Sequence, residues 1–342
     1  MRQQGNVMDV IADFATTFVS QFQKPTLAFL IGGMLIAALG SKLTIPDPIY
    51  RFIVFMLLIT IGMEAGLEIR QADLRQMLLP LIFAIVLGVG IVVVGAGLLT
   101  RLPKLQAADG YATAGLFGAV SASTLAAAMV VLDEAEIAFE AWVPALYPFM
   151  DLPALLVAIV LAGIAKQRAQ GGDRDKVDFT GIVVDTLKGS ALSALMLGLA
   201  LGLLTRPDSV VESFYEPLFR GLLSILMLVL GMEAWSRMAE LAKVAHWYAI
   251  YAAVGPLVHG LAAFALGYVA HITTGFSPGG VVLLAVMAGS SSDISGPPTL
   301  RAAIPHANPS AYIGSSTAVG TPIAIAVGIP LYVALAQLVF DL

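Results

Sequence analysis

The sequence of 342 residues contains no cysteine and few charged residues. Without cysteine there can be no disulfide, no thiol catalysis and no cysteine-based metal site. Charged residues make up 12% of the chain, against about 25% in ordinary soluble domains. So few charges could not cover the surface of a soluble protein of this size, which excludes a cytosolic globular enzyme. The net charge of −5 and the lack of a basic block give no indication of a nucleic-acid partner.

Apolar residues dominate the chain: 58% of all positions are hydrophobic and the mean hydropathy is +0.89. Apolar runs of about 20 residues, the length of a membrane-crossing helix, recur from end to end. The sequence therefore predicts an all-α polytopic membrane protein, a multi-pass protein of the inner (plasma) membrane. The ten predicted transmembrane helices lie at residues 26–44, 50–69, 77–99, 110–131, 140–165, 182–204, 216–235, 244–270, 277–300 and 310–338.

Two polar segments divide this predicted membrane domain. Residues 1–24 carry apolar side chains at helical spacing, which predicts an amphipathic segment lying at the membrane interface. The polar stretch 166–181 separates five spans from five. The predicted order is thus a first five-helix repeat at 25–165, a linker at 166–181 and a second five-helix repeat at 182–342.

The two halves of the chain resemble each other. The tetrapeptide Gly-Met-Glu-Ala occurs at 62–65 and again at 231–234, and the same offset pairs Ser121 with Ser290. A constant offset over a long stretch indicates an internal repeat. Because each half has an odd number of spans, the second copy must insert upside down, which gives the 5+5 inverted repeat typical of secondary transporters.

The distribution of basic residues predicts the orientation of the chain in the membrane. With the N-terminus outside, six of the 18 lysine and arginine residues face outward, and the others, including those of 166–181, face the cytoplasm. Since cytoplasmic loops carry the excess of basic residues, both termini are predicted to lie outside and the central linker inside.

Spans four and nine are poor candidates for continuous helices. Residues 115–124 read GLFGAVSAST, and residues 289–299 read GSSSDISGPPT. A glycine costs a helix about 1 kcal/mol and an interior proline about 3 kcal/mol. The sequence predicts two broken, crossing helices at matching positions of the repeats, the best sequence pointer to a transport site. Their second halves are expected to begin between Ser121 and Ser123 and at Gly296.

Two helix N-termini that meet at mid-membrane form a site for a small anion. Neither motif contains lysine, arginine or histidine, so backbone N–H groups and hydroxyls must hold the anion. The residues predicted to bind it are Gly118, Ala119, Ser121, Ser123, Thr124, Ser292, Ile294, Ser295 and Gly296.

Asp293 is the acidic counterpart of this anion site. A carboxylate at membrane depth costs at least about 2.5–3.5 kcal/mol and needs a cation or a proton. The hydroxyls around it are hard oxygen ligands, which suit Na⁺ as a co-transported ion, and no enzyme cofactor is expected. The predicted sodium ligands are Asp293, Ser290, Ser291, Ser292, Asp151, Ser315, Ser316 and Thr317.

Other interpretations of these residues remain open. Runs of small residues in membrane helices commonly allow close helix packing, and Asp151 could simply form a hydrogen bond with a neighbouring helix. The chain could also be a Na⁺-coupled organic-anion symporter, a cation/proton antiporter that uses Asp151 and Asp293, or a membrane receptor without transport. An intramembrane serine hydrolase is disfavoured because no general base with the context of a catalytic triad accompanies the serines.

Long motifs of this chain resemble those of the SbtA family, the sodium-dependent bicarbonate transporters of cyanobacteria. The resemblance covers about Pro25 to Gln337 and includes the span-four motif. The other matching stretches are PTLAFLIGGM at 25–34, ALYPFMD at 145–151, LGMEAWSR at 230–237, SSSDISGPPTLR at 290–301 and NPSAYIGSST at 308–317.

The resemblance implies high-affinity inward Na⁺/HCO₃⁻ symport in a CO₂-concentrating mechanism. It also implies ten spans, a homotrimer, and inhibition by a cytoplasmic PII-like protein, SbtB. The linker at 166–181 is shorter than the acidic central loop that is common in the family. We therefore expect the PII-like protein to contact other cytoplasmic loops, such as 101–108 and 237–245.

Overall fold

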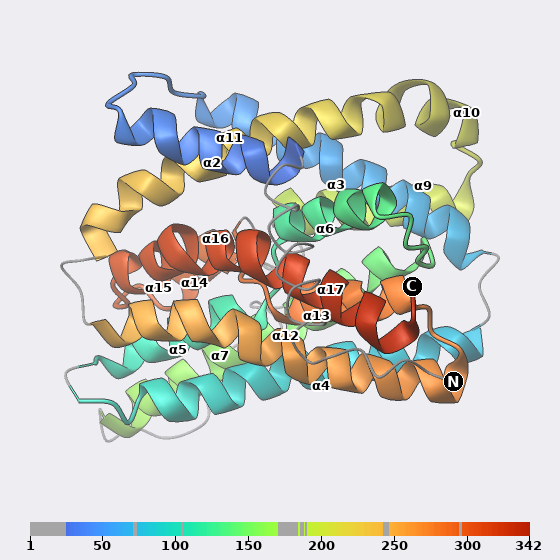
Figure 1. Ribbon diagram of the computed structural model, residues 1–342. Coiled ribbons are helices and arrows are strands. Elements are labelled where there is room, and N and C mark those ends of the chain that lie inside the picture. The colour runs from blue at the N-terminus through green and yellow to red at the C-terminus, as the bar shows by residue number, and fades with distance from the viewer. Residues whose placement is uncertain are drawn as a thin grey trace, which may run out of the picture.

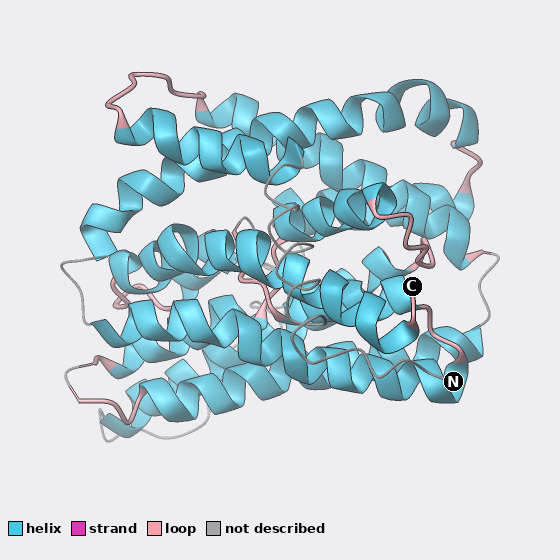
Figure 2. Cartoon of the chain, in the orientation of Figure 1, coloured by secondary structure: helices cyan, strands magenta, loops and turns pink. Residues whose placement is uncertain are grey.

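The computed structural model describes residues 25–70, 74–103, 105–169, 190–241, 246–293 and 296–342, together with Val184 and Lys188. Every regular element in these ranges is a helix (Figure 2). The segment 1–24, predicted to be amphipathic, and most of the predicted linker 166–181 lie outside the described residues.

The helices overlap the predicted spans, although α2 ends at Ala38, before the predicted end at 44, and α9 begins at Ser190, after the predicted start at 182. The first half contains α2 (Pro25–Ala38), α3 (Asp47–Ile69), α4 (Leu74–Leu99), α5 (Ala107–Gly118), α6 (Ala122–Glu134), η1 (Val143–Leu146) and α7 (Tyr147–Ala169). The second half contains α9 (Ser190–Leu204), α10 (Asp208–Val210), η2 (Val211–Tyr215), α11 (Glu216–Leu241), α12 (His246–Thr274), α13 (Pro278–Ala288), α14 (Gly296–Ala303), α15 (Pro309–Ser315), η3 (Ser316–Gly320), α16 (Thr321–Ile323), η4 (Ala324–Gly328) and α17 (Ile329–Phe340).

Six helical stretches in the described part of the chain are long and apolar enough to cross a membrane, which confirms a multi-pass helical protein. The stretch Ala107–Glu134, formed by α5 and α6, is 100% buried over its most apolar window, whereas the other five are 33–50% buried. The broken helix of the first half is therefore the centre of the molecule. These six stretches do not test the number of ten spans or the inverted repeat, which stay predictions.

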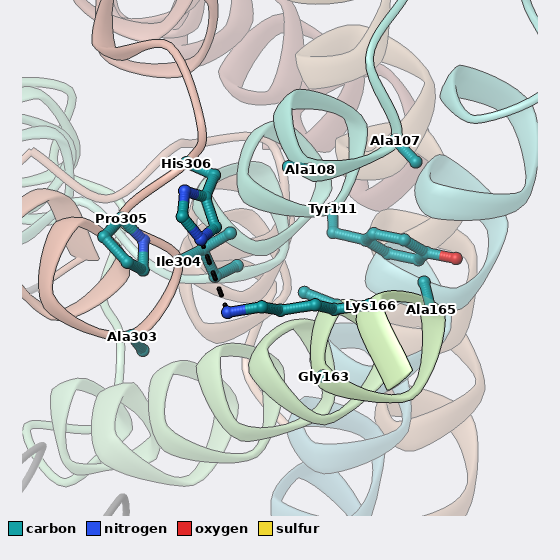
Figure 3. A pocket seen from close by; sticks show the side chains of 11 residues that line it. Ala107, Ala108, Tyr111, Gly163, Ala165, Lys166, Ala303, Ile304, Pro305 and His306 are labelled. Carbon is teal, nitrogen blue, oxygen red and sulfur yellow. Dashed lines mark hydrogen bonds between the residues drawn. The ribbon is translucent and has the colours of Figure 1, made fainter. Parts of the chain in front are cut away.

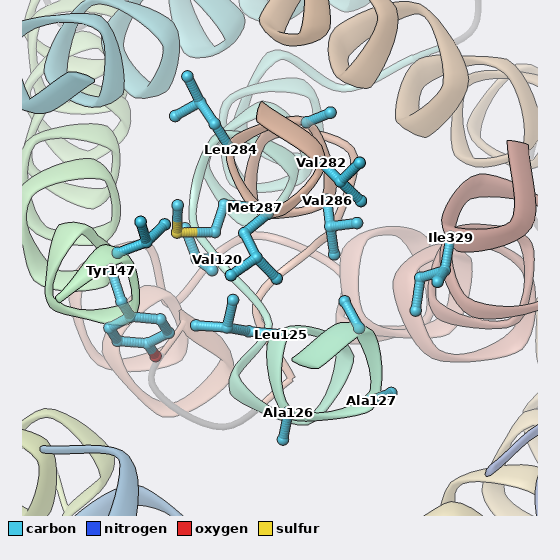
Figure 4. Packing of buried hydrophobic residues seen from close by; sticks show 14 of the residues in the cluster. Val120, Leu125, Ala126, Ala127, Tyr147, Val282, Leu284, Val286, Met287 and Ile329 are labelled. Atoms are coloured by element: carbon cyan, nitrogen blue, oxygen red, sulfur yellow. The ribbon is translucent and has the colours of Figure 1, made fainter. Parts of the chain in front are cut away.

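The helices form three layers (Figure 1). The layer of α2, α3, α9 and α11 lies along one side, and α4, α5, α7 and α12 lie along the opposite side. Between them lie α6, α13 and the C-terminal helices. Figure 4 shows the packing in this middle layer, where Leu125 of α6, Val286 of α13 and Ile329 of α17 contribute to one buried cluster. Because α6 and α13 pack against each other, the two breaks are held in the protein interior.

Within the first layer, α2 packs on α11 and α3 packs on α9 through glycines. Gly33 lies against the backbone of Leu228, and Gly198 lies against the backbone of Ile59. Ile59 and Leu228 are separated by the same 169 residues that separate Ser121 from Ser290. The repeat equivalent of Gly33 is Gly202, which lies against the Met63 carbonyl, one helical turn further on. The two halves thus make similar close helix contacts that differ by one turn, and small residues permit such contacts in membrane proteins.

The glycine contact of α2 leads to a stability prediction. A methyl group added at Gly33 would overlap the Leu228 carbonyl, whereas nothing lies within 4 Å of a methyl group added at Gly32. Gly33→Ala is expected to cost about 1–3 kcal/mol through overpacking. Gly32→Ala is expected to be neutral or to stabilise by up to about 1 kcal/mol through helix propensity. Thermal unfolding of the purified variants in detergent checks this, and equal melting temperatures for the pair would contradict it.

Candidate functional site

The break in the first half separates α5 from α6 at Ala119, Val120 and Ser121. Ala119 and Ser121 have extended backbone, and the Ser121 side chain accepts a hydrogen bond from the Thr124 N–H at 3.0 Å. Serine favours this position because its oxygen replaces one of the missing carbonyl acceptors at a helix start. The predicted start of the second half-helix near Ser121 is confirmed.

The break in the second half separates α13 from α14. Helix α14 begins at Gly296, as predicted, and Pro297 follows at a position where a helix needs no N–H donor. The Ser292 hydroxyl accepts a hydrogen bond from the Gly296 N–H at 2.8 Å. Each broken helix therefore restarts with a serine oxygen against an N–H of its first turn.

The two breaks are joined to each other by hydrogen bonds. The Ser292 N–H donates to the Leu116 carbonyl at 2.8 Å, and the Ser121 N–H donates to the Ser290 hydroxyl at 3.0 Å. A broken helix inside a membrane leaves backbone groups that water cannot reach, at several kcal/mol each. Here each break satisfies backbone groups of the other, so the crossing is one structural unit.

The acidic member of this unit is Asp293. Its Oδ2 accepts a hydrogen bond from the Ser123 hydroxyl, which in turn lies 3.1 Å from the Ser121 hydroxyl. Its other oxygen, Oδ1, is buried and has no hydrogen-bond partner among the described residues. A buried carboxylate oxygen without a partner is costly, and it is an open ligand position for a cation.

Asp151 lies at the first break from a different helix. On α7, Asp151 is fully buried and its Oδ1 accepts a hydrogen bond from the Val120 N–H at 3.0 Å. Asp151 thus forms a hydrogen bond with a neighbouring segment, and its role as a sodium ligand stays a prediction. Val120 lies in the segment where the helical bond pattern stops, so the carboxylate replaces an acceptor that the break removes.

The remaining predicted site residues divide between the crossing and the C-terminal helices. The Ser291 hydroxyl lies 2.7 Å from the Ser316 hydroxyl, which connects the second break to the π-helical turn η3. The Ser315 hydroxyl donates to the Tyr312 carbonyl of its own helix, and Thr317 is half-buried beside Ser316. Ile294 and Ser295 lie outside the described residues.

Several contacts at the crossing could not be found by sequence reasoning. The acceptor role of Leu116 and the bond between Asp151 and Val120 depend on backbone positions that no motif encodes. The sequence signal near Asp151 was a pair of prolines in the same helix, Pro148 and Pro153, which marked it as irregular without identifying its partner.

The donor set at the crossing suits a hard monovalent cation. Within the described residues, no group of three or more His, Cys, Asp or Glu side chains is arranged to hold a metal ion. A cation beside Asp293 would instead have one carboxylate, serine hydroxyls and carbonyl oxygens as ligands. Hard oxygen ligands of this kind disfavour soft transition metals.

A separate cavity of about 280 Å³ lies at the far end of α5 from the break (Figure 3). Its lining is mostly apolar and includes Tyr111. Lys166 and His306 lie at this cavity with 3.3 Å between Nζ and Nε2. The cavity contains none of the predicted site residues, so it is distinct from the crossing.

Comparison with known families gives one match of nearly full length. A family model described as the Na⁺-dependent bicarbonate transporter superfamily matches residues 25–337. No curated protein matches the chain. The matched range contains both broken helices and the residues that join them.

Proposed function

The chain belongs to the Na⁺-dependent bicarbonate transporter superfamily, and from this we propose that it is a high-affinity inward Na⁺/HCO₃⁻ symporter of the inner membrane that serves a CO₂-concentrating mechanism. The observation that carries the proposal is the open Oδ1 of Asp293 beside two helix starts. A carboxylate that needs a cation lies next to N–H groups that attract an anion.

We propose ten spans in a 5+5 inverted repeat, with both termini outside. The helix bounds support this: α3 begins with Asp47-Pro48 and α11 with Glu216-Pro217, at the constant offset of 169. The connections after α2 and α4 lie at one end of the molecule, and those after α6 and α12 lie at the other (Figure 1). This alternation is what successive crossings of a membrane require.

Bicarbonate binds, in this proposal, between the two restarted half-helices. The first turn of each helix carries N–H groups without intrahelical acceptors, and the dipole of each favours negative charge. The proposed contacts are the backbone and hydroxyl groups of Gly118, Ala119, Ser121, Ser123, Thr124, Ser292, Ile294, Ser295 and Gly296.

Sodium binds beside the anion, with Asp293 Oδ1 as its charged ligand. The hydroxyls of Ser290, Ser291, Ser292, Ser315, Ser316 and Thr317 and nearby carbonyls are the proposed neutral ligands. We propose that Asp151 supports this set by holding Val120 in place. Each ion lowers the cost of removing the other from water, which makes the binding of the two ions cooperative.

The layers of the fold support a division into a moving and a fixed part. We propose that α2, α3, α9 and α11 form a scaffold that assembles as a homotrimer, and that the other helices carry the ions as a mobile core. A cytoplasmic PII-like regulator would bind loops such as 101–108 and 237–245 of this assembly, because the central linker is short.

Uptake of ¹⁴C-bicarbonate tests the proposed function. Cells that lack their own bicarbonate carriers and express the chain are expected to take up label in Na⁺ medium and only at background in K⁺ medium. The control is the empty vector, with the protein amount in the membrane measured in parallel. Equal uptake in Na⁺ and K⁺, or no uptake by well-expressed protein, would contradict Na⁺/HCO₃⁻ symport.

A further inference from the structure

The cavity at the far end of α5 lies where two membrane-crossing stretches end. The stretch Ala107–Glu134 begins at Ala107 and the stretch Val143–Lys166 ends at Lys166, and both of these residues line the cavity. Its third wall is the end of α14 and the turn that follows, from Ala303 to His306. The cavity therefore lies at the depth of the polar headgroups of a membrane.

Small side chains leave this space open, and the fold keeps it so. Six of the eleven lining residues are alanine or glycine, contributed by α5, α7 and α14. The Asp109 carboxylate of α5 accepts a hydrogen bond from the Asn308 N–H at 2.7 Å, and the Asn308 side chain caps the start of α15. The turn that carries His306 is thus tied to α5, which fixes the opposite walls of the cavity relative to each other.

Two nitrogen groups meet at one side of the cavity. Nζ of Lys166 lies 3.3 Å from Nε2 of His306, and both side chains are exposed (Figure 3). The imidazole can accept one of the three N–H groups of the ammonium. Lys166 forms no ion pair with a carboxylate in the part of the chain that the structure describes. An oxygen anion is therefore the partner that suits this cation.

An apolar strip leads from the cavity along α7 into the membrane. Leu161 and Val157 precede Ala165 of the cavity wall by one and two helical turns, so the three share one face of α7. Both side chains are half-buried and pack against the buried cluster that includes Leu155. A small soluble anion would leave this strip uncovered, whereas the acyl chains of a lipid would remove it from water.

We propose that the cavity binds an anionic phospholipid. Its phosphate lies on Lys166 and His306, its glycerol fills the cavity, and its acyl chains follow Leu161 and Val157. Basic pockets between the ends of membrane helices bind such headgroups. A volume of about 280 Å³ suits a headgroup and glycerol, since pockets for whole drug-sized ligands span about 300–1,000 Å³.

The bound lipid would act on the crossing through the helices that it touches. The cavity is lined by α5 and α14, which are one half of each broken helix, and by α7, which carries Asp151. A ligand that binds only the folded arrangement of these three elements stabilises that arrangement. The inference therefore predicts a lipid that stabilises the site, and it does not depend on which ions the site carries.

Equilibrium binding of radiolabelled dioctanoylphosphatidylglycerol to the purified protein in a neutral detergent tests the proposal. The wild type is expected to bind this lipid saturably. Lys166→Gln is expected to weaken binding about tenfold, the effect of one lost hydrogen bond to a charged group. Lys166→Arg, which keeps the charge, is expected to stay within about threefold. Lys42→Gln removes an exposed lysine at the same end of the molecule and is the matched control, with unchanged binding.

Two further measurements separate the cavity from the charge. Ala165→Phe fills the cavity and keeps Lys166, and it is expected to weaken binding at least about tenfold. At about 100 times its dissociation constant, phosphatidylglycerol is expected to raise the melting temperature of the wild type by about 5 °C. The melting temperature of each variant without lipid shows whether that variant is folded.

Several outcomes would overturn the lipid site. Unchanged binding in Lys166→Gln, an equal loss in Lys42→Gln, or equally tight binding of phosphatidylcholine would show that the cation does not select the ligand. Displacement of the labelled lipid by inorganic phosphate at similar concentrations would show that a free anion is the ligand. Bicarbonate and Na⁺ take no part in these measurements, so a failure of the proposed transport would leave their result standing.

Discussion

Replacing Asp293 by alanine is expected to abolish sodium-driven bicarbonate uptake. The carboxylate has one oxygen on the Ser123 hydroxyl and one buried oxygen that finds no partner in the described part of the chain, and this second oxygen is the proposed Na⁺ ligand. Removing one member of a buried charge pair costs about 3–5 kcal/mol, which corresponds to a loss of roughly 10² to 4 × 10³ in sodium affinity. The Na⁺ concentration for half-maximal uptake, measured in carrier-deficient cells, reports this loss directly.

The Asp293→Asn variant removes the charge of the side chain but keeps its size and shape. Asparagine has nearly the same size as aspartate and keeps an oxygen that can accept from Ser123, so the crossing should fold while the sodium site loses its charge. We expect it to fail almost as completely as the alanine variant. Glu212→Gln, which removes an exposed acid of η2, is the control and should transport normally. Sodium affinity that stays unchanged in Asp293→Asn would show that the cation binds elsewhere.

The two helix breaks show how much of the fold could be predicted from the sequence alone. Glycine, proline and a capping serine act on the backbone within a few residues, so the starts of α6 at Ser121 and of α14 at Gly296 could be predicted from local chemistry. The same holds for the apolar spans, whose length is set by the membrane. These features need no knowledge of which helix lies beside which.

The contacts that join the breaks could not be predicted in the same way. The bonds from Ser121 to Ser290 and from Val120 to Asp151 connect residues far apart in the chain, and their geometry depends on helix packing. The internal repeat favoured the contact between Ser121 and Ser290, because these two residues are repeat equivalents. Equivalent residues of two crossing segments meet near the symmetry axis that relates the two repeats. Nothing in the local sequence of α7 indicated that Asp151 would accept from a backbone N–H of the first break.

The contacts of Asp151 predict the effect of replacing it on stability and on transport. Its Oδ1 accepts from the Val120 N–H, in a segment that lacks helical acceptors. Asp151→Ala leaves that buried N–H without a partner, at a cost of about 1–3 kcal/mol. We expect a lower melting temperature together with a loss of transport of at least about tenfold, because the first break positions the anion-binding half-helix.

Asp151→Asn distinguishes a positioning residue from a sodium ligand. The asparagine side-chain oxygen can accept the same hydrogen bond from Val120, so a residue that only holds the break should tolerate the change. We expect the melting temperature and the Na⁺ concentration for half-maximal uptake to stay close to those of the wild type. A folded Asp151→Asn protein whose sodium requirement rises about tenfold or more would instead place this carboxylate among the sodium ligands, since only the charge has been removed. Asp293→Asn and Asp151→Asn therefore distinguish the roles of the two carboxylates. We expect Asp293 to act through its charge, and Asp151 to act through the hydrogen bond that holds Val120 in the break between α5 and α6.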